Sequence, residues 1–577
     1  METTFDLVIR GGTVVDGSGG EPFAADVAIS GGKIAAVGTV AGKGREEIDA
    51  TGRIVTPGFV DIHTHYDGQL TWTSQLAPSS PHGVTTVVVG NCGVGFAPCK
   101  PEDRERLIVM MEGVEDIPDV VMSEGLQWEW ETFPEYLDAI ARRSYDVDVA
   151  AQLPHNPMRL YVMGDRAVAR EAATPEDNAR MAEIVQEAIE AGAIGLGTSR
   201  TVHHRTKAGD TVPSFGAHEA ELRAIGEAMR AGGHGFLQMV LDTDRIDEEM
   251  EMVRSVARDT GRKINYAAVQ FHGGDTQQYR RMLDFAGEAK AEGLSITVQI
   301  GPRPQAALMS IESQLNPFSL NPSFQAIDHL PLAEKVAIMR DPAFRKKLLA
   351  EEPVIPPTLK ALRRQFRNFD NIYLWGATPD YMPSADKTIA KLAAEAGISP
   401  EEYAYDVLLS HEGTGLMFMP FVNFAHGNDE AVHAMMADPN TLVGLGDGGA
   451  HVNSMCDSSY PTYLLKYWTR EAGARSFTLP WVVRALSAVP AEEVGLSDRG
   501  LIAPGYKADV NVIDYDGIEL GQPKVVHDLP AGGRRLMQLP SGYDATVVSG
   551  VVTQRGGRPT GEYPGKLVRG PQASPAA

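Results

Sequence analysis

Short apolar runs alternate with amphipathic stretches through the middle of this chain. Helical periodicity is present at residues 177–191, 217–231 and 277–292. Eight runs have the length and composition of buried strands, at residues 55–61, 85–90, 146–153, 193–198, 234–240, 264–271, 294–300 and 442–447. Strands that alternate with helices predict an α/β fold, a (β/α)8 TIM barrel whose chemistry lies at the carboxyl ends of the strands.

The two ends of the chain have a different texture. Short alternating runs separated by glycine pairs or turn residues predict hairpin strands, at residues 5–9, 13–16, 26–29, 33–37, 508–514 and 545–552. Isolated strands would leave unpaired edges, so we predict one small β-sandwich domain formed from both chain termini. The expected divisions are 1–56 plus 501–560 for the sandwich, 57–500 for the barrel and 561–577 for a flexible tail.

The alternation of strands and helices fails between about residues 302 and 440. This proline-rich insertion contains one further strand-like run at 372–375. Loops of such length are uncommon unless they have a function, often as a lid over a site. A peripheral subdomain without contact to the site is the alternative, and the sequence leaves both open.

Composition narrows the classes of partner. The chain has 577 residues, 43% of them hydrophobic, and a formal net charge of −24. That charge repels phosphate backbones and anionic lipids, so we expect no nucleic acid and no membrane partner. The N-terminus lacks a signal-peptide pattern, and three cysteines form no disulfide framework, which together predict a cytoplasmic protein. A homo-oligomer remains possible on this evidence.

The most informative motif runs from Gly58 to His65. Side chains alternate along a strand, so Asp61, His63 and His65 are expected on one face. An apolar run leads into this pair of histidines after a Pro-Gly break. Imidazole is the commonest protein ligand of zinc, and two imidazoles on one face predict a metal site. The alternative is that one histidine caps a turn and the other is a core residue.

Two further strand ends carry candidate ligands. Cys92 follows a β-branched run and is flanked by Gly90 and Gly93, and a thiolate is a strong zinc ligand. Asp447 ends the last apolar run, where a carboxylate can bind a metal and accept a proton from bound water. Taken alone, Cys92 could be a small buried hydrophobe and Asp447 a turn residue before glycine.

These motifs together resemble the amidohydrolase superfamily, and within it the N-acyl-D-amino-acid deacylases. The resemblance covers nearly the whole chain and is carried by residues 58–65, 83–93, 153–159, 190–200, 446–449 and 498–509. It implies a metal-bearing barrel with a β-sandwich made from both ends. It also implies that one or two zinc ions are held by His63, His65, Cys92 and Asp447.

The chain departs from the pattern of that family at the fifth and sixth strands. Gln238 stands where the family has a metal-binding histidine, and Ala268 replaces the second one unless a shift brings His272 into its place. Gln238 and His272 are therefore possible metal or substrate contacts. Glutamine is a weak ligand and alanine is none, so we expect one Zn²⁺ rather than two.

The expected carboxylate clamp also differs, since Gln270 and the segments 301–303 and 460–462 replace its Lys, Tyr and Arg. An anionic group without cations would suffer an uncompensated desolvation cost. Arg200, Arg205 or Arg303 could supply a relocated clamp. For each of them, the alternative is a surface or structural role without contact to the substrate.

The function predicted is metal-dependent hydrolysis of an amide, a C–N bond other than a peptide bond, in a small-molecule substrate. Asp447 would be the general base for a metal-activated water. The candidates for contacting the substrate or its carbonyl are His155, His272 and His451. One alternative is a hydrolase of a cyclic amide, lactone or neutral hydrophobic amide. Another is a catalytically inactive binding protein with the same fold.

Overall fold

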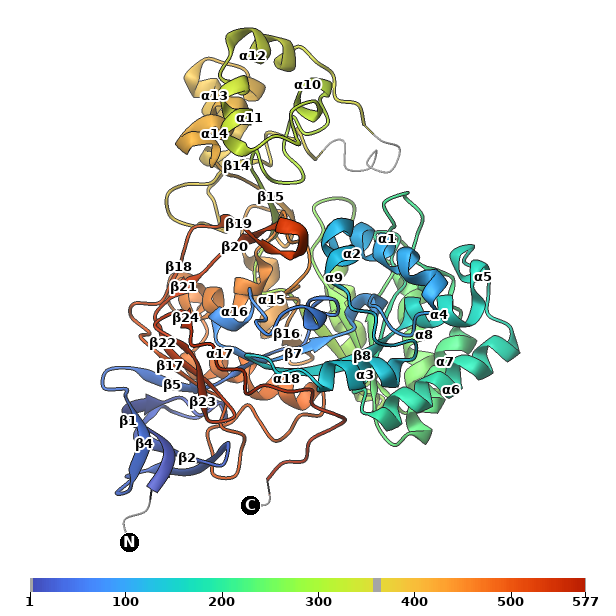
Figure 1. The fold of residues 1–577 in the computed structure, drawn as a ribbon, viewed down its shortest axis with the longest axis vertical. Coiled ribbons are helices and arrows are strands. Elements are labelled where there is room, and N and C mark those ends of the chain that lie inside the picture. The colour runs from blue at the N-terminus through green and yellow to red at the C-terminus, as the bar shows by residue number, and fades with distance from the viewer. Residues whose placement is uncertain (1–3, 356–364, 576–577) are drawn as a thin grey trace.

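A parallel eight-stranded sheet forms the centre of the molecule (Figure 1). The computed structural model describes residues 4–355 and 365–575. The strand order is β16-β12-β11-β10-β9-β8-β7-β6, which is sequential from the last strand to the first. The strands are β6 (Phe59–Asp61), β7 (Val84–Val89), β8 (Asp148–Pro154), β9 (Gly195–Ser199), β10 (Phe236–Val240), β11 (Lys263–Ala268), β12 (Ile296–Ile300) and β16 (Thr441–Val443). The eight predicted strands are thus present, and their order fits a TIM barrel.

The first predicted strand is divided in two at Gly58. Residues Ile54–Pro57 form β5, which belongs to the sheet of the chain ends, and β6 alone belongs to the barrel. A Cβ atom at Gly58 would lie 2.2 Å from Thr85 Oγ1, so the two barrel strands approach too closely there for any side chain. Because β6 ends at Asp61, both histidines of the motif lie just beyond the strand rather than within it.

The segments that follow the first and last strands meet and close the ring. Thr64 and Gly448 form a parallel bridge. Asp447 N donates to His63 O at 3.0 Å, and His65 N donates to Gly448 O at 2.8 Å. A Cβ atom at Gly448 would lie 2.3 Å from Ser79 Oγ, so this close approach requires glycine. Closure therefore brings the carboxyl ends of β6 and β16 to one point.

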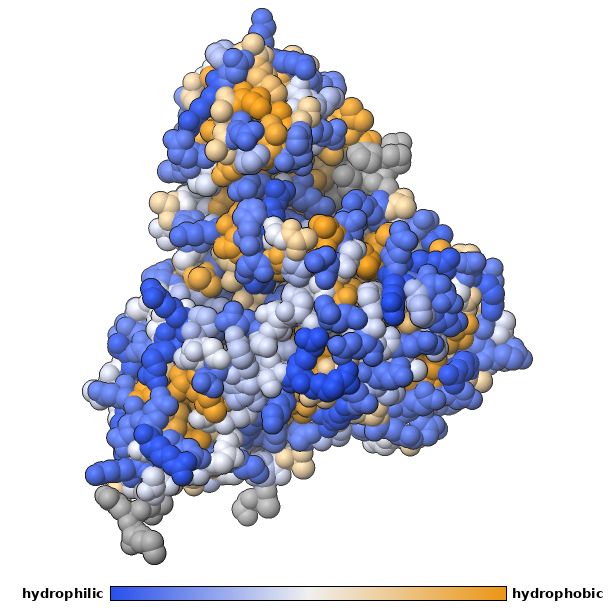
Figure 2. Space-filling view, in the orientation of Figure 1, coloured by the Kyte–Doolittle hydropathy of each residue, from blue (hydrophilic) through white to orange (hydrophobic). Residues whose placement is uncertain are grey.

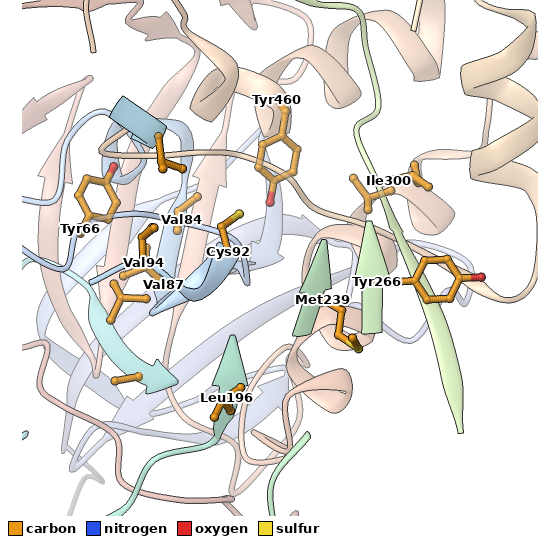
Figure 3. Close-up of a cluster of buried hydrophobic side chains, with 14 of the residues drawn as sticks. Tyr66, Val84, Val87, Cys92, Val94, Leu196, Met239, Tyr266, Ile300 and Tyr460 are labelled. Atoms are coloured by element: carbon orange, nitrogen blue, oxygen red, sulfur yellow. The ribbon is translucent and has the colours of Figure 1, made fainter. Parts of the chain in front are cut away.

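Helices cover the sheet, and the three predicted ones are confirmed as α6 (Pro175–Ala191), α7 (Glu219–Ala231) and α9 (Gln278–Ala291). Thr174 and Asp177 form a capping box at the start of α6, which explains why the helix begins there. Further helices include α1 (Arg104–Glu115), α2 (Asp119–Gly125), α3 (Phe133–Ala141), α4 (His155–Met163), α5 (Asp165–Val168), α8 (Ile246–Thr260), α16 (Tyr460–Tyr463), α17 (Leu479–Leu486) and α18 (Ala488–Glu493). Figure 3 shows part of the core, with Leu196, Met239, Tyr266 and Ile300 on neighbouring strands.

The two ends of the chain share one nine-stranded sheet, drawn in blue and red in Figure 1. Its order is β24-β23-β22-β17-β5-β1-β2-β3, with β4 paired to β1. The remaining bounds are β1 (Thr4–Val14), β2 (Phe23–Ser30), β3 (Lys33–Gly38), β4 (Lys43–Asp49), β17 (Val510–Ile513), β22 (Tyr543–Val548), β23 (Val551–Arg555) and β24 (Arg558–Pro559). The pairing of β5 with both β1 and β17 joins the two ends, as expected for one β unit. That this unit is a sandwich stays a prediction.

The insertion between β12 and β16 forms a lobe with its own core, at the top of Figure 1. It contains a three-stranded sheet of order β13-β15-β14, made of β13 (Gln305–Met309), β15 (Met417–Val422) and β14 (Tyr373–Leu374). Among the described residues its helices are α10 (Pro322–Gln325), α11 (Leu332–Met339), α12 (Pro342–Leu349), α13 (Ile389–Ala396) and α14 (Pro400–Gly413). The next helix, α15 (Glu430–Ala437), packs on the barrel beside α9 and β16. Asn423 N donates to Gln270 O at 2.7 Å, which ties the base of the lobe to the end of strand β11.

Residues 561–575 differ from the flexible tail predicted for 561–577, of which 576–577 lie outside the described residues. Gly565 and Leu567 form bridges with Tyr145 and Val149, and Gln572 forms one with Leu496. These backbone hydrogen bonds fix the segment along the barrel, a tertiary contact with no local sequence signal. In the face drawn in Figure 2, most surface residues are hydrophilic. Among the helices of the described residues, none has the length and apolar character needed to cross a bilayer.

Candidate metal centre

His63, His65 and Cys92 converge at the mouth of the barrel, as their positions at strand ends predict. One ligand atom from each lies within 4.8 Å of the others, and all three residues are buried. His63 Nε2 lies 3.2 Å from Cys92 Sγ. The two imidazoles arrive from the end of β6 and the thiol from the turn that follows β7.

Asp447 reaches the same place from the segment after β16. Its Oδ1 lies 3.5 Å from His63 Nε2 and 3.6 Å from His65 Nε2. Its side chain keeps 15% exposure, whereas that of His65 keeps 1%. The carboxylate therefore lies between the buried imidazoles and the outside of the barrel. A group that contacts both a metal and a substrate needs such a position.

The spacing of these donors fits a divalent cation. Two donors that bind one ion at about 2.0–2.3 Å in tetrahedral geometry lie about 3.3–3.8 Å apart. The separations of 3.2, 3.5 and 3.6 Å are close to that range. Both ring nitrogens of His65 are buried and have no hydrogen-bond partner among the described residues, which is costly unless the imidazole binds another group. Imidazole, thiolate and carboxylate together suit zinc and similar metals.

Polar side chains from other strands orient these groups. Gln299 on β12 places Oε1 2.8 Å from His63 Nδ1, so the Nδ1–H donates to it and Nε2 is left free as an acceptor. Cys92 N donates to Gln238 Oε1 at 2.9 Å. Gln305 Nε2 donates weakly to Asp447 Oδ2 at 3.4 Å. Gln238 thus uses its oxygen to hold the backbone of Cys92.

The backbone is strained at several of these positions. Cys92, Asp447 and His451 have φ values of 53°, 45° and 47°, in the left-handed region that residues other than glycine rarely adopt. Such a conformation costs of the order of 1–3 kcal/mol for each residue and persists only where the surroundings enforce it. Strain at three neighbouring polar residues is typical of a functional site.

Burial and nearby charges shift the pKa values of the cluster in opposite directions. Burial lowers the pKa of His63 to about 4 and raises that of the Cys92 thiol to about 12. Burial alone would lower the pKa of His65, but Glu115, Asp447 and Cys92 raise it well above its ordinary value. The two histidines outweigh burial at Asp447 and hold its pKa well below the usual range. Asp447 is therefore ionised at neutral pH.

Sequence reasoning missed several residues near the cluster. Glu115, the last residue of α1, places Oε2 3.5 Å from His65 Nε2 and 3.8 Å from His451 Nε2. His204 lies close enough that His65 and His451, after burial, help to lower its pKa to about 3. Gln299 had a usable signal, since it is a polar residue inside an apolar strand. Glu115 and His204 lie outside the strands and had none.

His155 and Arg200, predicted as substrate contacts, have other partners in the structure. His155 Nδ1 lies 2.7 Å from Thr198 Oγ1, and its Nε2 lies 2.7 Å from Glu221 Oε1. Arg200 forms a bidentate pair with Glu249, at 2.7 and 2.8 Å. Both ring nitrogens of His155 and the fork of Arg200 are thus occupied within the protein, and a role of either in substrate binding stays a prediction.

Arg303 is also buried and paired. It donates to Asp457 Oδ1 at 2.9 Å and lies over the ring of Tyr381, 3.8 Å from its centroid.

His272 lies in the segment after β11, and its Nε2 has no hydrogen-bond partner among the described residues. The charge that acts on it belongs to His426, not to the cluster. His451, with 29% side-chain exposure, does lie at the cluster, beside Glu115.

A small pocket opens beside Asp447. Its wall includes Val452, Leu536, Asp457 and Arg535. Besides Asp447, the pocket has two charged residues, and each has a partner of opposite charge: Asp457 binds Arg303 at 2.9 Å, and Arg535 binds Asp528 at 2.7 and 2.8 Å. A molecule bound in the pocket would thus contact the candidate base, Asp447, and would meet no unpaired positive charge in the pocket wall.

A barrel with two histidines after its first strand, a thiol after its second and an aspartate after its last defines a metal-dependent hydrolase. The comparisons are consistent with this class. Residues 46–554 match the model of the amidohydrolase family. The chain belongs to this family, and it is a metal-dependent enzyme that acts on carbon–nitrogen bonds other than peptide bonds.

Individual relatives are distant but extend over nearly the full chain. An uncharacterized protein of Mycobacterium tuberculosis is 28% identical over an alignment that covers 97% of this chain and 93% of that one. The D-aminoacylase of Alcaligenes xylosoxydans xylosoxydans is 26% identical, with 88% of both chains covered. The crystal structure of an N-acyl-D-glutamate deacylase from Bordetella bronchiseptica, complexed with zinc and a phosphonate inhibitor, has a TM-score of 0.64 at 24% identity. It covers 98% of this chain and 100% of that chain.

Proposed function

We propose that this protein hydrolyses the amide bond of an N-acylated small molecule, using one zinc ion and Asp447 as general base. The observation that carries the proposal is the convergence of His63, His65 and Cys92 within 4.8 Å of one another, with Asp447 at 3.5 and 3.6 Å from the two imidazoles. The resemblance to D-aminoacylase and the zinc of the deacylase complex support the substrate class and the metal.

His63, His65, Cys92 and Asp447 would hold the ion. When bound, a divalent cation supplies Lewis acidity to a carbonyl oxygen and lowers the pKa of water from 15.7 towards ~7. Asp447 is ionised at neutral pH, which is the form that a general base requires. Gln305 orients that carboxylate through Oδ2, which leaves Oδ1 directed at the histidines. Asp447 would then return the proton to the leaving nitrogen.

His451 and His204 are candidates to contact the substrate carbonyl. Burial, together with the charges of His65 and His451, keeps the pKa of His204 at about 3, so its ring is neutral and can donate one hydrogen bond. Its Nδ1 has no partner among the described residues. His451 is partly exposed and adjoins the segment that carries Asp447.

A neutral substrate is the second candidate, and the pocket favours it. In the pocket wall, Arg535 is paired with Asp528. Arg303, which the sequence offered as a relocated carboxylate clamp, pairs with Asp457 through Nη2, while its Nε and Nη1 have no hydrogen-bond partner among the described residues. Placing an anionic group there without a free cation would leave a charge uncompensated. A cyclic amide, a lactone or a hydrophobic amide would avoid this cost.

The test combines metal analysis with a substrate panel. Purified protein is assayed for bound zinc, and turnover is compared for N-acyl-D-amino acids, their L forms and neutral amides of matched size. We expect bound zinc and turnover that a chelator abolishes. Preference for neutral amides would select the second candidate, and a metal-free protein whose turnover resists chelators would contradict the proposal.

A further inference from the structure

Glu115 is a buried carboxylate that the amidohydrolase pattern does not account for. It ends helix α1, outside the barrel strands, and its side chain keeps 3% exposure. Asp116, in the left-handed conformation with φ of 54°, stops the helix directly after it. His451 N donates to Glu115 O at 2.5 Å, so the helix end is fixed to the loop that carries Asp447.

The carboxylate lies at ligand spacing from His65. Oε2 is 3.5 Å from His65 Nε2, nearly the 3.6 Å at which Asp447 lies from the same nitrogen. Both separations exceed the usual 2.7–3.2 Å of an N–H···O hydrogen bond. They match the distance of about 3.3–3.8 Å between two donors that share one ion. Direct hydrogen bonding therefore does not explain the pair.

Imidazoles of the cluster and other carboxylates surround Glu115. Its Oε1 is buried without a hydrogen-bond partner among the described residues. Besides burial, the groups that act on it are His65, His451, Asp447 and Asp67, with no lysine or arginine among these four. Two carboxylates and a thiol around two imidazoles make a donor set whose negative charge a divalent cation would offset.

We propose that Glu115 is an additional ligand of the cation at His65, supplied by helix α1 in place of the ligands missing from the fifth and sixth strands. The inference rests on the proposed function, because it requires an ion at His63, His65 and Cys92. In those two strands, the Oε1 of Gln238 accepts a hydrogen bond from the backbone of Cys92, and the side chain of Ala268 has no atom that can bind a metal. A carboxylate from α1 would supply an oxygen ligand on the His65 side of the ion, where the family pattern has histidines from those strands.

The experiment measures Zn²⁺ affinity by competition with a chromogenic chelator, and the visible absorption of the Co²⁺-substituted protein. The variants are Glu115→Gln, Glu115→Asp and His63→Ala. Glu112→Gln is the matched control, since Glu112 lies on the same helix but pairs with Lys207 at 2.7 Å. Far-UV circular dichroism of each apoprotein checks that the variants fold.

We expect Glu115→Gln to weaken Zn²⁺ binding at least about 10-fold, the lower bound for groups that merely orient a ligand. The Co²⁺ bands should shift in the same variant, whereas Glu112→Gln should change neither quantity. Glu115→Asp should also lose affinity, because the shorter side chain withdraws the oxygen. If Glu115 acted through its negative charge alone, Glu115→Asp would bind Zn²⁺ with wild-type affinity, and that result would overturn the inference.

The two levels of proposal fail differently. If the wild-type protein binds Zn²⁺ and His63→Ala loses it, while Glu115→Gln keeps wild-type affinity and Co²⁺ bands, the inference is wrong and the proposed function stands. If the wild-type protein binds no ion, or His63→Ala binds as tightly as wild type, the proposed function and the inference fail together.

Discussion

His63 Nδ1 lies 2.8 Å from Gln299 Oε1, so an amide on strand β12 determines which nitrogen of the imidazole faces Cys92 and Asp447. An amide oxygen only accepts, which assigns the proton of the neutral ring to Nδ1 and the lone pair to Nε2. The first and seventh strands are thereby coupled through one hydrogen bond, and the geometry of the metal site depends on a residue that is not a ligand.

Replacing Gln299 by leucine should weaken metal binding about 10- to 100-fold, as expected for the loss of a group that orients a ligand. The fold should survive, since the Nε2 of Gln299 has no hydrogen-bond partner among the described residues and leucine fills a similar volume. Zn²⁺ competition titrations measure the effect. Gln186→Leu, at an exposed position on α6, is the control and should leave affinity unchanged. Equal affinities for both variants would show that Gln299 does not orient His63.

Asp447→Asn should reduce kcat at least about 100-fold, within the range attributed to a general acid–base group. Asparagine keeps the shape of the side chain but cannot accept the proton. Steady-state kinetics on the best substrate of the panel give the ratio, and thermal unfolding checks that the fold is intact. Asp516→Asn, at an exposed position, controls for loss of charge. A variant at position 447 with full turnover would remove this residue from the mechanism.

Apolar periodicity was sufficient to place the eight strands, because each is a short run of buried residues between turn signals. It also placed His63, His65, Cys92 and Asp447 at strand ends, where a parallel barrel gathers side chains. Strand boundaries were less accurate. The run at residues 55–61 predicts one strand, but it is divided at Gly58 into two strands of different sheets. The only sign of this division is the close contact of Gly58 with Thr85, which the sequence does not reveal.

Contacts between segments far apart in the chain could not be predicted from the sequence. Glu115 reaches the site through the end of an inserted helix, and nothing in residues 104–115 distinguishes it from a surface glutamate. Arg303 reads as a candidate substrate contact, but its partner Asp457 lies 154 positions away. Local patterns encode periodicity and turns, whereas such pairings depend on how the insertion and loops pack.

Removal of the metal should lower thermal stability. An ion that binds the folded state alone stabilises it by about 2.7 kcal/mol when its free concentration is 100 times Kd. Protein dialysed against a chelator should therefore unfold at a lower Tm, and added Zn²⁺ should restore the original value. Mg²⁺ is the control, because it prefers oxygen ligands and should not replace zinc at a site with a thiolate. Identical Tm values with and without chelator would contradict a tightly held ion.

His82 provides a test of pH dependence away from the metal centre. Burial lowers its pKa to about 3, against an ordinary value of 6.5. Its Nε2 lies 2.8 Å from Gln538 O, a carbonyl that requires the proton there, so Nδ1 accepts from Thr462 Oγ1 at 2.7 Å. The folded state thus holds a neutral ring, whereas the unfolded chain takes up a proton as the pH falls below about 6.5.

Because the unfolded state binds more protons between pH 6.5 and 3, the free energy of unfolding should fall with decreasing pH in that window. One such group contributes a slope of about 1 kcal/mol per pH unit between pH 6 and pH 5. Denaturant titrations at both pH values measure the slope. His82→Gln, which cannot titrate, should reduce it by that amount, although its own stability is lower at every pH. His527→Gln, at an exposed position, should keep the wild-type slope. An unchanged slope in His82→Gln would mean that His82 is protonated in the folded protein.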